Sequence, residues 1–161
     1  MGVSVSPSLT LGINMSYLIT KRTKVEEFEI HDARGNKTGE VGKDVKTFYD
    51  IQYKGETITL DDCDGEGLYA EEIAEAINVA DEPRLDKLGI FRSDYDSELE
   101  PDNLILGVKL IQLEDAMYGN TLGVLNTEKL NRDIVTLSAI LKRDFGCEIK
   151  PSLYLNPNLS Y

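Results

Sequence analysis

The residues best suited to chemistry form one short acidic motif, Asp62-Cys63-Asp64-Gly65-Glu66-Gly67. Asp62, Asp64 and Glu66 alternate with small residues, so a tight loop could turn all three carboxylates toward one point. Carboxylate oxygens are the ligands that Ca²⁺ and Mg²⁺ prefer in proteins. We therefore take these three residues as a candidate metal site, with Ca or Mg as the candidate cofactor.

The spacing of this motif is similar to the first half of an EF-hand loop, with acids at positions 1, 3 and 5 and glycine at position 6. The twelfth position is Ile73, where an EF-hand has a bidentate glutamate. A bound cation would therefore need Glu71 or Glu72 as ligands in another geometry. The alternative is a polar turn whose acids favour the positive end of a following helix.

Signals of catalysis are sparse. The single histidine, His31, lies in a strand-like run with no serine or cysteine elbow that it could serve. Glu148-Ile149-Lys150, with Pro101-Asp102 upstream, is similar to the short motif of metal-dependent nucleases, but a nuclease also needs a basic path for its substrate. We predict a protein that is not an enzyme, with no catalytic residue.

The excess negative charge is confined to residues 61–102. This stretch holds fifteen acidic and three basic side chains, which account for the whole net charge of -12, so the rest of the chain is formally neutral. Binding to nucleic acid or to an anionic membrane depends mainly on Lys and Arg. The composition therefore predicts no direct nucleic-acid partner, no membrane partner, and a basic protein surface as the preferred partner.

The candidate partner-binding residues belong to two parts of the acidic stretch. Those on one face of a predicted helix are Glu71, Glu72 and Glu75, and those in a predicted loop are Asp94, Asp96, Glu98, Glu100 and Asp102. Dense carboxylates can imitate a phosphate backbone and select basic partners. The leading hypothesis is an acidic interaction protein that binds a nucleic-acid-binding protein and occludes its site, as an inhibitor or an immunity or anti-defence protein would. The alternative is an acidic face that serves only solvation.

Length and hydrophobic patterning predict a single domain over residues 1–161 with an α+β fold. Alternation of apolar and polar residues predicts strands at 9–20, 25–31, 46–53 and 57–60, which would form an N-terminal meander over 1–60. Residues 61–102 read as an acidic loop-helix-loop, and residues 103–161 as strand-helix-strand. We expect one mostly antiparallel sheet of about six strands.

Three helices are predicted to pack on that sheet. Apolar residues at helical spacing predict a helix over 68–80 and a longer one beginning at Asn126 or Thr127 and ending at Gly146. A short third helix would run from Asp81 to Leu88, with Gly89 as its stop. Residues 104–113 are nearly all apolar and predict a central strand, whereas Pro151 places the last strand, 147–155, at an edge.

Two distant segments resemble one another. Residues 7–17 and 151–161 agree at seven of eleven positions, including the Pro-Ser-Leu that opens each. The alternative function follows from this similarity: a structural or assembly protein, of a viral or phage particle or another homo-oligomer, in which the terminal strand segments carry the contacts. Coincidence together with the shared composition of strands is the other explanation.

The two cysteines, Cys63 and Cys147, match no zinc or redox spacing, and we take both as reduced thiols. No stretch approaches the about 18 apolar residues of a membrane span, and the N-terminus lacks the features of a signal peptide. The sequence therefore predicts a soluble, cytoplasmic protein.

Overall fold

A computed structural model describes residues 4–5, 8–62, 68, 70–78, 88–92, 100–112, 126–156 and 159–160. The strands in these ranges are β1 (Ser4–Val5), β2 (Ser8–Asn14), β3 (Ile19–His31), β4 (Lys37–Tyr53), β5 (Glu56–Asp61), β6 (Leu88–Arg92), β7 (Leu104–Gln112), β8 (Ser152–Asn156) and β9 (Leu159–Ser160). The helices are α1 (Ala70–Ala76) and α2 (Thr127–Phe145), with 3-10 turns η1 (Met15–Tyr17) and η4 (Pro101–Asn103).

The described strands form two main sheets. One has four strands in the order β6-β7-β2-β8, the other has the order β3-β4-β5, and every pairing is antiparallel. The α+β class and the mostly antiparallel pairing are thus confirmed. The expectation of one sheet of about six strands is wrong, because seven strands are divided between two sheets.

The division occurs at η1. Asn14 Oδ1 accepts a hydrogen bond from the Ser16 N–H, and the Leu18 N–H donates to the Met15 carbonyl, so the chain turns where continuous strand was predicted. The Asn14 side chain also donates to the carbonyl of Asp102 at 2.7 Å, which ties η1 to η4. Only β3, β4 and β5 form the predicted meander, while β2 belongs to the other sheet.

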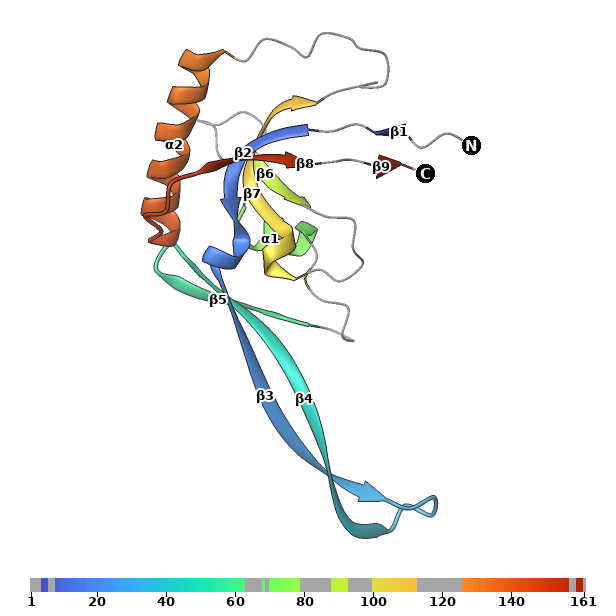
Figure 1. Cartoon of the computed structure of the whole chain (residues 1–161). Coiled ribbons are helices and arrows are strands. Elements are labelled where there is room, and N and C mark those ends of the chain that lie inside the picture. Colours follow the sequence, from blue (N-terminus) through green and yellow to red (C-terminus); the bar gives the residue numbers. More distant parts are fainter. Residues whose placement is uncertain are drawn as a thin grey trace.

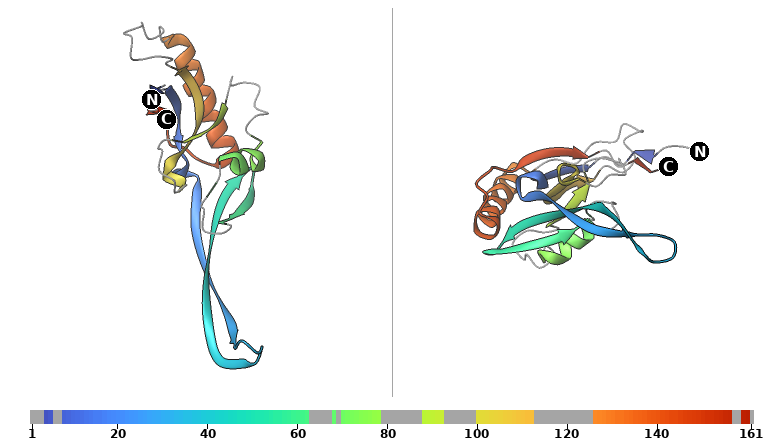
Figure 2. Two further views of the ribbon diagram at one scale, coloured as in Figure 1. Left: turned by 90° about the vertical axis from the view of Figure 1, so that its right-hand side faces the viewer. Right: turned by 90° about the horizontal axis from the view of Figure 1, so that it is seen from below.

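The longest elements, β3 and β4, form a hairpin that extends far beyond the rest of the protein (Figures 1 and 2). We call its projecting part, residues 20–50, the arm. Its turn is fixed by Asp32, whose Oδ1 accepts from the N–H groups of Arg34 and Asn36 at 2.8 Å each, and by Gly35 with a φ of 82°. Such an Asx turn can close a hairpin without any tertiary contact.

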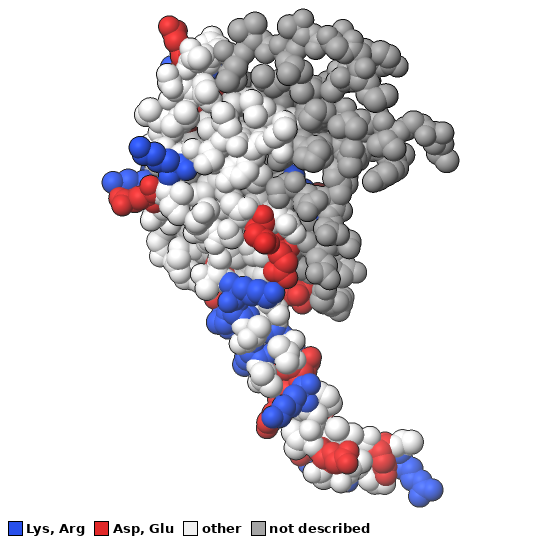
Figure 3. Space-filling model, in the orientation of Figure 1, with Lys and Arg blue, Asp and Glu red and all other residues white. Residues whose placement is uncertain are grey.

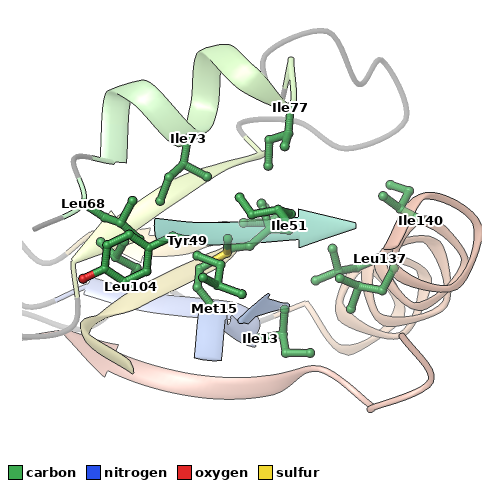
Figure 4. Close-up of a cluster of buried hydrophobic side chains, with 14 of the residues drawn as sticks. Ile13, Met15, Tyr49, Ile51, Leu68, Ile73, Ile77, Leu104, Leu137 and Ile140 are labelled. Atoms are coloured by element: carbon green, nitrogen blue, oxygen red, sulfur yellow. The ribbon is translucent and has the colours of Figure 1, made fainter. Parts of the chain in front are cut away.

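The core lies in the body, where α1, α2 and both sheets meet (Figure 4). Ile73 of α1, Met15 of η1 and Leu137 of α2 are each fully buried there. Tyr49 and Ile51 of β4 enter the same cluster, so the end of the arm nearest the body is held by the core. Residues 20–48 of the arm contribute no side chain to this core.

The helix α2 follows its sequence signals closely. Asn126 caps it by accepting from the N–H groups of Glu128 and Lys129, and Gly146 ends it with a left-handed φ of 64°. The predicted central strand is also confirmed, since β7 pairs with β6 and β2. Helix α1 is shorter than the predicted helix over 68–80, since it runs from Ala70 to Ala76.

The predicted short helix is not supported at its end. Gly89, expected as the helix stop, lies inside β6 opposite Gly107 of β7. Tertiary pairing with an apolar strand has overridden the local signal there. The rest of the predicted helix lies outside the described residues.

The two segments that resemble each other pair directly. β2 and β8 are antiparallel neighbours, with Leu9 opposite Leu155 and Leu11 opposite Leu153. The short pair β1 and β9 continues in the same register, with Ser4 opposite Ser160, so the two ends of the chain lie side by side (Figure 1). β8 lies at the edge of its sheet, as predicted, but it begins at Ser152, so Pro151 precedes the strand and the predicted start at Cys147 is wrong.

Candidate interaction surfaces

One face of the arm carries an exposed row of valines. Val25 of β3 lies directly opposite Val45 of β4, and Val41 lies further out on the same face, beyond Lys43, which pairs with Glu27 at 3.9 Å. They are 55%, 60% and 57% exposed. Toward the body the same side of β4 continues into the buried Tyr49 and Ile51, so the valine row extends the face of the core into solvent.

The other face of the arm is held together by charge. Lys24 and Lys46 are directly opposite one another, and the Glu26 carboxylate bridges them at 3.2 and 2.8 Å. Hydrogen bonds from Lys46 and then Lys24 lower the pKa of Glu26. Further out, the Phe28 ring lies over Gly42, where no side chain competes for the space.

Charges of both signs are intermixed along the arm (Figure 3). Residues 20–50 carry seven acidic and seven basic side chains, so this part of a strongly acidic protein is formally neutral. Mixed charge on both strands keeps a long open hairpin soluble and discourages random strand addition. The arm is therefore suited to a selective contact through its valine row.

At the base of the arm the structure gathers residues from both ends of the acidic stretch. Lys21 donates to both carboxylate oxygens of Glu100, at 3.0 and 3.2 Å, and this contact raises the pKa of Lys21. Glu100 and Asp62 also act together on Tyr49, whose pKa is raised first by burial and then by the negative charge of these carboxylates. A residue predicted for a metal site and one predicted for partner binding thus lie around one buried tyrosine.

A second link at the base joins all three strands of the arm sheet. Arg22 donates to Asp50 through Nε and Nη2 at 3.0 and 3.4 Å, and Thr59 of β5 donates to the same carboxylate at 2.7 Å. The Arg22 guanidinium also lies over the Phe48 ring, 4.8 Å from its centroid. These hydrogen bonds, with that of Arg22 the largest, lower the pKa of Asp50.

The acidic face of α1 borders a hollow of about 550 Å³ against β5. Glu72 and Glu75 line it from the helix and Asp61 lines it from the strand, with Thr59, Leu60 and Ala76 between them. Glu71 and Glu72 are both exposed, but Glu71 does not line the hollow. The structure therefore brings together two of the three helix residues predicted for partner binding. It adds Asp61, which was not among the predicted partner-binding residues.

The remaining predicted residues do not form one surface that the structure describes. Asp102 is exposed in η4, and Asp62 follows β5. Asp64, Glu66, Asp94, Asp96 and Glu98 lie outside the described residues. Within the described ranges, no three His, Cys, Asp or Glu side chains are grouped as they would be around a metal ion. The metal site remains a prediction.

A smaller pocket, of about 140 Å³, lies between α2, α1 and the β4–β5 turn. Asp144 at its wall is buried, and Arg143 donates to both of its carboxylate oxygens at 2.6 Å. Lys54, in a left-handed conformation at the turn, donates its N–H to the Asp144 carbonyl at 2.7 Å. The hydrogen bond from Lys54 joins the end of α2 to the sheet of β3, β4 and β5.

The outer edge of β8 is the last surface of interest. Leu153 and Leu155 are 49% and 69% exposed, although Leu11, the residue of β2 opposite Leu153, is only 1% exposed. The similarity of the two terminal segments pointed to β8, but it did not show which side of this strand would lack a neighbouring strand. That edge could be found only from the sheet order.

Comparison of the chain with protein-family models, with curated proteins and with solved structures found no match. In the part of the chain that the structure describes, neither helix is long and apolar enough to cross a membrane. Its function must therefore be inferred from its surfaces.

Proposed function

We propose that this protein is a structural or assembly subunit that uses the arm to contact a neighbouring subunit. The observation that carries the proposal is the arm itself, which extends far beyond the body (Figure 2) and has Val25, Val41 and Val45 exposed on one face. An isolated two-stranded hairpin is only marginally stable in water. An element this long and uncovered is most useful where a partner surface covers it.

The arm has the properties of a docking element. Its valine row offers apolar area, and its neutral charge avoids the repulsion that two copies of a chain with net charge -12 would otherwise meet. The core residues Tyr49 and Ile51 fix its direction at the base. A fixed direction lowers the entropy cost of docking.

The proposal is tested by shortening the arm without disturbing the body. Thr23 and Thr47 are directly opposite one another, so residues 24–46 can be replaced by Asn-Gly, which favours a two-residue hairpin turn. Sedimentation and electron microscopy of the full-length chain should show concentration-dependent assemblies that the shortened chain, with unchanged helix content, does not form.

A finer variant separates the valine row from the arm as a whole. Val25→Thr with Val45→Thr keeps β-branched side chains but removes apolar area, and it should weaken assembly. Thr23→Val with Thr47→Val, one rung nearer the body on the same face, should not weaken it. Equal assembly by the full-length and shortened chains would overturn the proposal.

The acidic hollow favours a second candidate function, binding of a basic protein partner. Asp61, Glu72 and Glu75 present three carboxylates around one concave surface, which suits a Lys- or Arg-rich segment. A lysine octapeptide is a direct probe. Its binding, followed by calorimetry, should weaken steeply as salt is raised and should be lost in Glu72→Lys with Glu75→Lys.

Glu71→Lys is the matched control for this binding. Glu71 is an exposed glutamate of the same helix, but it lies outside the hollow. If charge reversal at Glu71 weakened peptide binding as much as reversal at Glu72 or at Glu75, the effect would come from net charge alone. The hollow would then have no special role.

A further inference from the structure

We propose that the protein forms a twofold homodimer in which β8 pairs antiparallel with β8 of a second copy, joining two four-stranded sheets into one. The proposal concerns the body and not the arm, and it adds a second contact to the proposed assembly function. Its failure would leave the function of the arm untouched.

The first support is the open edge itself. Among the described strands β8 pairs only with β2, so its outer backbone N–H and C=O groups face no neighbouring strand. Natural edge strands are usually protected by charged side chains, prolines or bulges. The segment Ser152–Asn156 has no charge and no internal proline, and its register with β2 shows no irregularity.

The other sheet edges in the described part of the chain carry charged side chains. The arm has Lys or Glu side chains along both of its strands, and β5, the other edge of that sheet, begins with Glu56 and ends with Asp61. β6, at the edge of the four-stranded sheet opposite β8, contains Gly89 and ends in the exposed Arg92. β8 therefore differs from every other described edge of comparable length.

The second support is the position of the exposed leucines. Leu153 and Leu155 are on the same side of the sheet as Leu11, which is 1% exposed in the core. The apolar side of the sheet thus continues to the edge and stops there uncovered. A strand added at this edge would extend it and cover both leucines.

The third support is that β8 is complementary to itself. In an antiparallel pair centred on Tyr154, Leu153 faces Leu155 of the second copy, and Ser152 faces its Asn156. The four leucines then meet on one side and the two tyrosines on the other. A twofold interface requires this kind of self-complementarity.

Charge favours the same contact. A copy with a net charge of -12 repels another copy, and an uncharged strand is a place where two copies can approach without opposing carboxylates. The dimer should therefore persist or strengthen as salt screens the bodies from one another. Binding through the acidic hollow would show the opposite dependence on salt.

Sedimentation equilibrium of the full-length chain at moderate salt tests the dimer. Leu155→Glu places a carboxylate directly opposite Leu153 of the second copy, where it has no partner, and should raise the dissociation constant at least about tenfold. Val135→Glu is the matched control, because Val135 on α2 is 70% exposed, close to the 69% of Leu155, and lies away from β8. It should leave the dimer intact.

Disulfide trapping tests the register independently of any destabilised variant. With Cys63 and Cys147 replaced by serine, Tyr154→Cys lies on the twofold axis, where directly opposite Cα atoms are about 4.5 to 5.5 Å apart and can form a disulfide. Oxidation should give a covalent dimer, whereas Tyr17→Cys, at an exposed site off the edge, should not.

A full-length chain that stays monomeric at all concentrations would overturn the dimer, as would dimerisation unaffected by Leu155→Glu or equal trapping at Tyr17→Cys. The chain with the shortened arm should still dimerise. Loss of dimerisation there, with β8 unchanged, would assign self-association to the arm and would also overturn the proposal.

Discussion

The buried hydroxyl of Tyr49 has no hydrogen-bond partner among the described residues, although its side chain is fully enclosed. A buried polar group without a partner costs free energy, because it has lost water and gained nothing in return. Lys21, which pairs with Glu100, lies over the Tyr49 ring with its Nζ 6.0 Å from the ring centroid. The tyrosine thus helps position the arm through its ring while its hydroxyl opposes stability.

Replacing Tyr49 by phenylalanine should therefore stabilise the protein, by about 1 kcal/mol. The ring would keep its packing and the unpaired hydroxyl would be gone. Urea unfolding followed by circular dichroism measures the change. Tyr17→Phe is the control, because Tyr17 is 60% exposed and should show no change. A destabilised Tyr49→Phe would mean that the hydroxyl has a partner in solution.

Asp50 should make the stability of the arm base depend on pH. Its folded-state pKa is lowered from the ordinary 3.8, chiefly by Arg22, so its contribution is present above that value and lost as pH falls through the folded pKa. Asp50→Asn should accordingly be less stable than the parent at pH 7, and the difference should shrink below about pH 4. Urea unfolding at pH 7, 4 and 2.5 measures it, and a constant difference would contradict the assignment.

At the scale of the elements, the four-stranded sheet depends on two glycines that face each other. Gly12 of β2 and Gly107 of β7 are directly opposite. A Cβ at Gly12 would clash with the carbonyl oxygen of Leu106, and one at Gly107 with that of Leu11. Because the obstacles are backbone atoms of neighbouring strands, a side chain could fit only if the strands moved apart.

Gly12→Ala should therefore destabilise the protein by about 2 kcal/mol or more, as overpacking of a core does. Thermal unfolding checks this, with Gly89→Ala as the control. A Cβ at Gly89 would approach the Phe91 ring to 3.2 Å, and a ring end can shift. Similar losses in both variants would show that strand propensity, and not the close approach, sets the cost.

The cap of α2 gives a second prediction at this scale. Asn126 Oδ1 accepts two backbone N–H groups at 3.1 Å each, so Asn126→Ala should cost about 1 kcal/mol. Asn131→Ala, at an exposed interior position, should instead stabilise the helix by about half a kcal/mol. Chemical unfolding of the two variants separates the loss of the cap from the general preference for alanine.

The elements also show what the sequence can and cannot predict. Helix α2 was predictable because Asn126, its apolar face and Gly146 agree with one another. The full length of the arm was not predictable. Its two faces contact no core, and charged residues alternate with valines and threonines, so the usual pattern of apolar and polar residues is missing. The division into two sheets depends on a turn at Met15 that looks like continued alternation.

The candidate surfaces were predictable to a similar extent. Glu72 and Glu75 were found from charge and helical spacing, but Asp61 joins them only through the packing of β5 beside α1. The pairing of Lys21 with Glu100 links residues far apart in the chain, and no local pattern indicates it. Similarity of the terminal segments did point to β2 and β8, which lie side by side with leucines opposite one another.

At the scale of the whole molecule, stability should be uneven. The body contains the described core, whereas the distal arm contributes no side chain to it. Backbone amides in residues 24–46 should therefore exchange with deuterium by local opening, far faster than those of β2 and β7. Mass spectrometry of the dilute protein measures this, and equal protection along the arm would contradict it. Assembly should slow the exchange of the arm selectively.

The position of β2 determines when the body can form during synthesis. Leu11 pairs with Val108 on one side and with Leu153 on the other, so an early strand must wait for two partners made much later. The arm, whose strands are adjacent in sequence, can form as soon as it leaves the ribosome. Contacts between distant parts of a chain slow folding, and the growing polypeptide would carry an unpaired, leucine-bearing β2 for most of its translation.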